Sequence, residues 1–134
     1  MQQSDMAMVA LAAVTAVGIG AGLYTTGGPE YARKIQRDEI RIDHLQQLMS
    51  TVDCTARSGG GKLPETLDPA NDCAPLPPLT DPGSDEPYRY LRTGTGIYQL
   101  CAGFETDMSW RNGFDLTAFD AATGCLTRTF RLYE

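Results

Sequence analysis

The first feature of the chain is an uninterrupted apolar stretch. Residues 6–24 read MAMVALAAVTAVGIGAGLY, and no charged side chain lies between Asp5 and Glu30. About 20 mostly apolar residues are needed to cross a bilayer, so the pattern predicts a transmembrane helix over residues 6–26, after a short tail over residues 1–5. A cleaved signal peptide and a buried soluble helix are the alternatives. No basic residue precedes the stretch, which argues against the first, and its length argues against the second.

A second apolar pattern follows the break that the Gly27–Pro29 segment introduces. Over residues 29–53, apolar positions recur at intervals of three, four or seven, which predicts a juxtamembrane amphipathic helix with a proline in its first turn. This helix is expected to end near Val52, before the glycine-rich residues 58–61. The apolar positions are Ala32, Ile35, Ile42, Leu45, Met49 and Val52. They are expected to pack on the protein's own sheet, with a partner helix as the alternative.

Polar side chains of this helix lie mostly off the apolar stripe. They include Arg33, Lys34, Arg37, Asp38, Arg41 and Gln46. Because the helix follows the predicted span, the basic members are expected to form a solvated face that touches lipid headgroups. His44, the single histidine, is expected to be a surface or capping residue, because a lone imidazole makes neither a metal site nor a catalytic set.

Residues 54–134 are expected to form a small β-rich domain. Most of the eight prolines lie in a loop over residues 57–87, where regular structure is not expected. Strand-like runs at residues 88–91 and 97–104, with a turn between them, predict a hairpin. Further strands are predicted at residues 115–119 and 123–133. The predicted fold class is therefore α+β, with the amphipathic helix packed on a small antiparallel sheet.

The four cysteines are Cys54, Cys73, Cys101 and Cys125. An even number of cysteines in a small exported domain favours two disulfides, for which three pairings are possible. We favour Cys54–Cys73, which would tie the helix end to the proline-rich loop, and Cys101–Cys125, which would tie the late strands. Structural zinc is disfavoured because no closely spaced pair of ligands exists. Free thiols in a cytosolic domain are the remaining alternative.

Charge and candidate chemistry narrow the function. The chain has a net charge of −6 and an isoelectric point near 4.7, which disfavours nucleic acid as a partner. No motif for catalysis, cofactor binding or metal binding is present, so an enzyme is not expected. Asp81, Asp85 and Glu86 form a carboxylate cluster of the kind that suits calcium, but acids at a surface turn are the expected role.

Small residues in the predicted span indicate a partner. Gly18 and Gly22 lie four residues apart, a spacing that lets another transmembrane helix approach closely, so integral membrane subunits are the expected partners, with lipid around the rest. The basic residues after the span favour a cytoplasmic domain, whereas the four cysteines favour an oxidising compartment. We expect a single-pass protein of a bacterial inner membrane with its C-terminal domain in the periplasm.

The order of these elements resembles that of type IV pilins and type II secretion pseudopilins. The local matches are Leu79–Tyr90 (LTDPGSDEPYRY), which resembles the Asp-Pro…Pro-Tyr-x-Tyr segment of major pseudopilins, Lys62–Leu67 (KLPETL), which is similar to their Leu-Pro-x-x-Leu stretch, and Tyr98–Thr106 (YQLCAGFET), which resembles a strand of anchored relatives of pilins. The resemblance implies an N-terminal hydrophobic helix, a continuing amphipathic half and an antiparallel sheet.

The chain departs from the pilin pattern where filaments assemble. It has no basic leader followed by Phe-Thr-Leu-x-Glu, no acid inside the span, and a Gly-Gly-Pro break in the helix. Leader cleavage is therefore not expected. The leading interpretation is a non-catalytic accessory subunit of an inner-membrane complex, with an exported pilin-like domain. A pseudopilin-like component of a secretion or pilus assembly, and an anchored ligand-binding module, are the alternatives.

Overall fold

A computed structural model describes residues 2–67, 73, 76–112 and 118–131. The chain divides into two compact units, residues 1–35 and residues 36–134, and the boundary between them falls within the second helix. Each unit is described by itself.

The first unit contains helix α1, Gln2–Thr25. Its 24 residues include no buried side chain, and at about 1.5 Å per residue they span about 36 Å, more than the roughly 30 Å of a bilayer core. The helix is long and apolar enough to cross a membrane. It begins four residues before the predicted start, so residues 2–5 are helical and not a separate tail. Asp5 in the first turn favours this early start, because it complements the helix dipole.

A glycine break separates α1 from helix α2, Gly28–Ser58. Gly27 has φ +79° and Gly28 has φ +69°, a left-handed conformation that side chains disfavour. A Cβ atom at Gly27 would also lie 3.0 Å from the Tyr31 side chain. The chain turns at the place where the sequence predicted a break, and α2 begins one residue before the predicted position.

The C-terminal end of α2 lies further along the chain than predicted. The helix was expected to end near Val52, but it continues to Ser58 and stops at Gly59. Ala56 is fully buried, so the apolar face continues beyond the predicted end. The N–H of Gly61 donates to the carbonyl of Ala56 at 2.7 Å, which closes the helix with a glycine cap.

The second unit contains a four-stranded antiparallel sheet. Its strands are β1 (Arg89–Gly94), β2 (Ile97–Cys101), β3 (Phe119–Asp120) and β4 (Cys125–Thr129), in the order β1-β2-β4-β3. The predicted hairpin is β1–β2, and β4 is the predicted closing strand, shorter than expected. Of the predicted strand at residues 115–119, only residues 118 and 119 lie within the described ranges. Strand β3 there consists of two residues, Phe119 and Asp120. The predicted α+β class, with a small antiparallel sheet, is confirmed.

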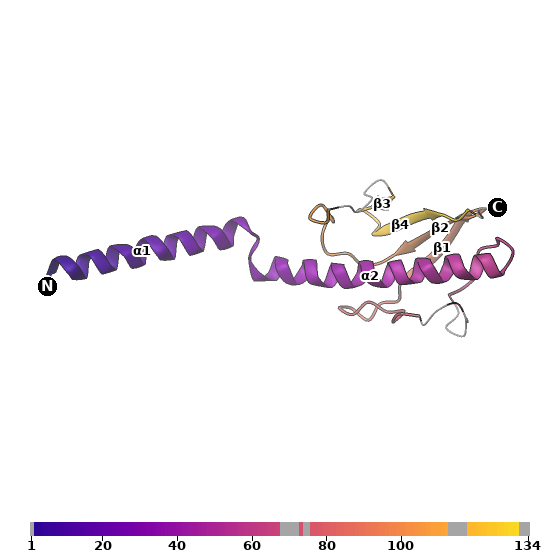
Figure 1. Cartoon of the computed structure of the whole chain (residues 1–134), viewed down its shortest axis with the longest axis horizontal. Helices are drawn as coiled ribbons and strands as arrows, with labels where there is room; N and C mark the ends of the chain where they lie inside the picture. Colours follow the sequence, from indigo (N-terminus) through magenta and orange to yellow (C-terminus); the bar gives the residue numbers. More distant parts are fainter. Residues whose placement is uncertain (1, 68–72, 74–75, 113–117, 132–134) are drawn as a thin grey trace. The chain divides into compact units, whose positions relative to one another are not determined.

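Within the second unit, the part of α2 from residue 36 onward lies along one face of the sheet (Figure 1). The main core joins Leu45, Leu48, Val52 and Ala56 of α2 to Tyr98 and Leu100 of β2, with Leu63 and Tyr88 beside them. A second, smaller cluster contains Ile42, Met108 and Phe119. Of the predicted apolar stripe, Ile42, Leu45 and Val52 are buried in these clusters, and Met49 packs beside them. Ala32 is exposed and Ile35 is only partly buried, whereas Leu48, absent from the predicted stripe, is fully buried.

Candidate functional site

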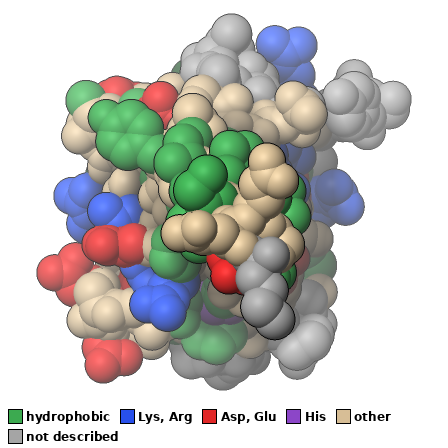
Figure 2. All heavy atoms as spheres, turned by 90° about the vertical axis from the view of Figure 1, so that its left-hand side faces the viewer, with side chains coloured by type: hydrophobic (Ala, Val, Ile, Leu, Met, Phe, Trp, Pro, Cys, Tyr) green, Lys and Arg blue, Asp and Glu red, His purple; other side chains and the backbone are tan. Residues whose placement is uncertain are grey.

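The exposed apolar surface of α1 is the first candidate site. Its large hydrophobic side chains are between 55% and 90% exposed: Met6, Met8, Val9, Leu11, Val14, Val17, Ile19, Leu23 and Tyr24. The space-filling view from the side of the N-terminus shows hydrophobic side chains at the surface that faces the viewer (Figure 2). A helix that is apolar on all sides is stable only where something other than water covers it, either lipid or protein.

Gly18 and Gly22, the predicted helix-packing residues, lie in the second half of α1. Apart from the neighbouring residues and the nearby backbone of the helix itself, no atom of the described residues lies within 4 Å of a Cβ built at either position. The surface over these glycines is therefore open. Gly20, between them, is equally open but faces the other side of the helix, because each residue advances the helix by about 100°.

The second candidate site is a group of charges, three of them buried, which we call the Arg41 cluster: Asp38, Arg41, Asp81 and the partly exposed Glu105. The first two lie on α2, Asp81 in the turn before β1, and Glu105 in the loop after β2. Asp38 is 0% exposed, Asp81 2% and Arg41 3%. Charges are buried at this depth only where opposite charges and hydrogen bonds satisfy them.

Arg41 is the centre of the cluster. Its Nη1 donates to Asp38 Oδ1 at 2.7 Å and to Glu105 Oε2 at 2.8 Å. Its Nε and Nη2 donate to the two carboxylate oxygens of Asp81, with Nη2 at 2.9 Å from Oδ1. This two-point pairing uses the planar geometry of the guanidinium group, which a lysine could not reproduce. Three acids from three segments therefore meet on one cation.

Asp38 fastens the loop after β2 to the helix. Its carboxylate accepts the backbone N–H groups of Glu105 at 3.0 Å and Thr106 at 2.9 Å, and the Thr106 hydroxyl at 2.7 Å. The same hydroxyl accepts the indole N–H of Trp110 at 2.8 Å. Trp110 is thus tied into the cluster through one intermediate group.

Asp81 fastens the turn before β1 in the same way. Its Oδ1 accepts the N–H groups of Gly83 at 2.7 Å and Ser84 at 3.3 Å. A Cβ atom at Gly83 would lie 3.0 Å from Arg41 Nη2, so a side chain there would press on the guanidinium group. The missing side chain of Gly83 lets the turn approach Arg41.

The charges of the cluster stabilise one another. Hydrogen bonds from Arg37 and Arg41, opposed by burial, lower the pKa of Glu105 to about 2. Burial raises the pKa of Asp81, but the hydrogen bond from Arg41 and the N–H of Gly83 outweigh it, and the net pKa is lowered. Burial also acts to lower the pKa of Arg41, and its carboxylate partners raise it overall. Glu105, Asp81 and Arg41 are therefore charged at neutral pH.

Arg37 forms the exposed side of the cluster. Its Nε and Nη2 donate to the two oxygens of Glu105 at 2.6 and 2.7 Å. The hydrogen bonds that Arg37 donates to Glu105 raise the pKa of Arg37. Glu105 thus bridges two arginines that lie four residues apart on one face of α2.

These contacts correct several predictions. Arg41 was expected on a solvated face, Asp38 was placed off the apolar stripe, and Asp81 was expected to be a surface acid, but all three are buried. The signal was present in the spacing, because residues 38, 41, 42 and 45 lie on one face of a helix. Asp38 and Arg41 extend the buried face of α2 toward its N-terminus, beyond the buried apolar residues that begin at Ile42. Their partners, 40 and 64 residues away, carried no local signal.

A second polar network joins α2 to the sheet. Tyr98 is fully buried, and its hydroxyl donates to Asp53 Oδ1 at 2.9 Å. Arg128 Nη2 donates to Asp53 Oδ2 at 3.0 Å. Burial, and then the Asp53 carboxylate, raise the pKa of Tyr98. Among the described residues, every buried side-chain nitrogen and oxygen has a hydrogen-bond partner.

His44 is partly buried, and its Nδ1 lies 2.8 Å from the Tyr88 hydroxyl. Burial, and then the charge of Asp81, raise the pKa of Tyr88 to about 12. The pair links α2 to the residue that precedes β1. This contact is a specific tertiary hydrogen bond, which a simple surface role for His44 did not anticipate.

All four cysteines are paired. Cys54 is bonded to Cys73, and Cys101 to Cys125. The first bond joins the last part of α2 to the segment before β1. The second joins directly opposite residues of β2 and β4.

Comparison of the chain with protein-family models, with curated proteins and with solved structures finds no match.

Proposed function

We propose that this chain is a non-catalytic accessory subunit of a bacterial inner-membrane complex, anchored by α1 with residues 36–134 in the periplasm. The observation that carries the proposal is the surface of α1, a helix of 24 residues with no buried side chain. Such a surface needs lipid or protein around it. A single apolar helix whose side chains are not buried by the rest of the described chain is suited to anchoring in a membrane and to docking against another transmembrane helix.

The proposed partner is an integral membrane protein subunit that packs against Gly18 and Gly22. Both positions are open in the chain, and they lie on one face of α1. Small residues at this spacing allow close approach of a second helix, where van der Waals contacts add up without side chains in the way. Lipid covers the remaining large apolar side chains.

The two disulfides support the periplasmic location of the domain. Every cysteine of the chain is bonded. Disulfides persist in the periplasm and are rare in the cytosol. The net charge of −6 also makes nucleic acid an unsuitable partner, because the chain would repel the phosphate backbone.

The non-catalytic role is supported by how the charged groups are used. The carboxylates of the Arg41 cluster are occupied by arginines and by backbone N–H groups. Each pairing holds a loop against α2. The cluster is suited to fixing the shape of the domain rather than to acting on a substrate.

The test is purification of the full-length protein in mild detergent with its native membrane. We expect integral membrane subunits to co-purify with the unaltered protein and with the Gly20→Ile variant. Gly18→Ile and Gly22→Ile should lose these subunits, because a branched side chain on the docking face prevents close approach. All three variants should remain in the membrane fraction, because each is more apolar than glycine.

Two outcomes would contradict the proposal. One is a purified protein that carries no other membrane protein under several mild detergents. The other is equal loss of partners for Gly20→Ile and Gly22→Ile, which would show a general effect of bulk rather than a docking face.

A pseudopilin-like subunit of a secretion or pilus assembly is the second candidate. The observation that favours it is the order of elements, in which α2 continues from an apolar helix and packs on an antiparallel sheet. In that case copies of this chain would contact one another through α1. Cysteine placed at position 22 would then form crosslinks between identical chains, whereas the accessory-subunit proposal predicts crosslinks to a different protein.

A further inference from the structure

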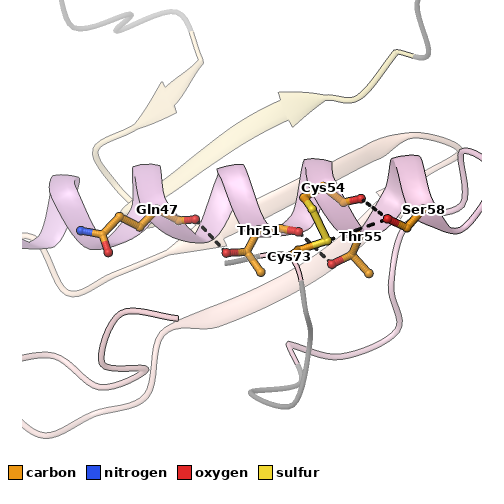
Figure 3. The surroundings of a disulfide bond; sticks show 6 residues. All are labelled: Gln47, Thr51, Cys54, Thr55, Ser58 and Cys73. Carbon is orange, nitrogen blue, oxygen red and sulfur yellow. Dashed lines mark hydrogen bonds between the residues drawn. A yellow bond between two sulfur atoms is a disulfide. The ribbon is translucent and has the colours of Figure 1, made fainter. Parts of the chain in front are cut away.

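The two disulfides differ in their exposure to solvent. Cys101 is 1% exposed and Cys125 is 6% exposed, within the paired strands β2 and β4. Cys54, in the last part of α2, and its partner Cys73 are both partly exposed (Figure 3). A thiol must reach a sulfur atom along the S–S axis to attack it, so exposure decides which bond can react in the folded protein.

We propose that Cys54–Cys73 is a thiol-exchange site, on which a dithiol reductant acts while Cys101–Cys125 stays closed. One thiolate of the dithiol attacks a sulfur of the pair, the S–S bond breaks, and the other cysteine leaves as a thiolate that takes up a proton. The second thiol of the reductant then displaces the mixed disulfide. The net reaction gives two electrons and two protons to Cys54 and Cys73 and leaves the reductant as a disulfide.

The surroundings of the bond favour Cys73 as the leaving group. Ser58 Oγ lies 3.9 Å from Cys73 Sγ and donates to the Cys54 carbonyl at 3.2 Å (Figure 3). When Cys73 departs with a negative charge, this hydroxyl proton can turn to it. A hydroxyl donor stabilises a thiolate and so speeds its departure. Cys54, near the C-terminal end of α2, is less favoured as a thiolate because that end of the helix carries partial negative charge.

The bond acts as a latch: its reduction releases the covalent tie between α2 and the segment around Cys73, and it does not unfold the domain. Cys73 lies in the chain between Leu67 and Leu76, and both leucines pack against the main core. Reduction removes the covalent tie and leaves these contacts, the sheet and the Arg41 cluster in place. The segment that follows α2 then keeps the packing of these leucines and the hydrogen bond from the Tyr90 hydroxyl to the Pro64 carbonyl at 2.8 Å. This inference does not depend on which protein meets α1.

The test is partial reduction of the full-length protein in detergent with dithiothreitol under native conditions. Samples are quenched with an alkylating reagent, and each cysteine is followed by peptide mass mapping. We expect Cys54 and Cys73 to be alkylated at least tenfold faster than Cys101 and Cys125. In denaturant the two pairs should react at similar rates. Tryptophan fluorescence should keep its native form after Cys54–Cys73 alone is reduced.

Equal rates for the two pairs under native conditions would overturn the proposal, as would earlier reduction of Cys101–Cys125. Unfolding of the domain on selective reduction would overturn the latch. The Ser58→Ala variant tests the role of Ser58, since it should slow reduction of Cys54–Cys73 severalfold and leave the other pair unchanged. An unchanged rate in Ser58→Ala would refute Cys73 as the assisted leaving group.

Discussion

Helix α1 and the first half of helix α2 differ in where their side chains find contacts. Every described residue of α1 is exposed, and its apolar side chains find no partner in the described part of the chain. On α2, Asp38 and Arg41 are buried, and the partners of Arg41 outside the helix lie 40 and 64 positions away along the chain. The apolar side chains of α1 need lipid or another protein around them. The buried charges of α2 need opposite charges and hydrogen bonds, which other segments of the same chain supply.

This difference shows why the two regions tolerate change differently. The role of α1 depends on composition and on one face, so many apolar substitutions leave it intact. The role of α2 depends on individual atoms, because a buried charge that loses its partner costs several kcal/mol. Substitutions in the two regions can therefore break or sharpen the comparison.

The largest effect is expected for Arg41→Met. This change leaves the buried carboxylates of Asp38 and Asp81 without their cation, which costs about 3–5 kcal/mol. Unfolding of the full-length protein in detergent, followed by the fluorescence of Trp110, measures the loss. Arg33→Met is the matched control, because Arg33 is exposed on the same helix and should change stability by less than about 0.5 kcal/mol. Similar losses for both variants would refute the buried role of Arg41.

A smaller loss is expected for Tyr98→Phe. The phenol hydroxyl donates to the buried Asp53 carboxylate, and its removal leaves that oxygen without one donor while Arg128 remains. A loss of about 1–3 kcal/mol is expected in the same unfolding measurement. Tyr31→Phe, at an exposed position, should be neutral. A neutral result for Tyr98→Phe would show that the hydroxyl does not stabilise the packing of α2 on the sheet.

Gly83→Ala should cost about 1 kcal/mol, because the new Cβ atom lies 3.0 Å from Arg41 Nη2 and displaces the guanidinium group. Gly103→Ala is the matched control, since apart from its chain neighbours no atom of the described residues lies within 4 Å of a Cβ there. Both variants are compared by thermal unfolding. If Gly103→Ala were the more damaging change, the close approach of the turn to Arg41 would not explain the glycine.

The smallest effect is a pH dependence from Glu105. Its folded pKa is about 2, below its ordinary value of 4.5, so its contribution is complete above about pH 4.5 and is lost as the pH falls toward 2. The contribution should stay below about 1 kcal/mol, because the side chain is partly exposed. Glu105→Gln should flatten the stability curve in this window, and Glu39→Gln, on an exposed residue, should not. Identical curves for both variants would contradict the ion pairs of Glu105.

The sequence predicted the parts of the fold that depend on local pattern. The apolar span, the core-facing residues Ile42, Leu45 and Val52, and the hairpin follow from periodicity. The order of the cysteines also favoured the pairs that the structure contains. These features need no knowledge of residues far along the chain.

The Arg41 cluster could not be predicted in the same way. Charged residues on a helix are usually solvated, and only the distant acids Asp81 and Glu105 make burial of Arg41 favourable. The end of α2 was placed too early because the apolar stripe was taken to stop near Val52, whereas the glycine cap is what ends the helix.

The most direct test of the proposed anchored, periplasmic subunit is the intact mass of the protein extracted from native membranes, with free thiols blocked before lysis. The account predicts a chain in the membrane fraction that carries no blocking group and is lighter by four hydrogens than its reduced form, because all four cysteines are bonded. Four blocked thiols would place the domain in the cytoplasm, and recovery of the chain only in the soluble fraction would contradict the anchor.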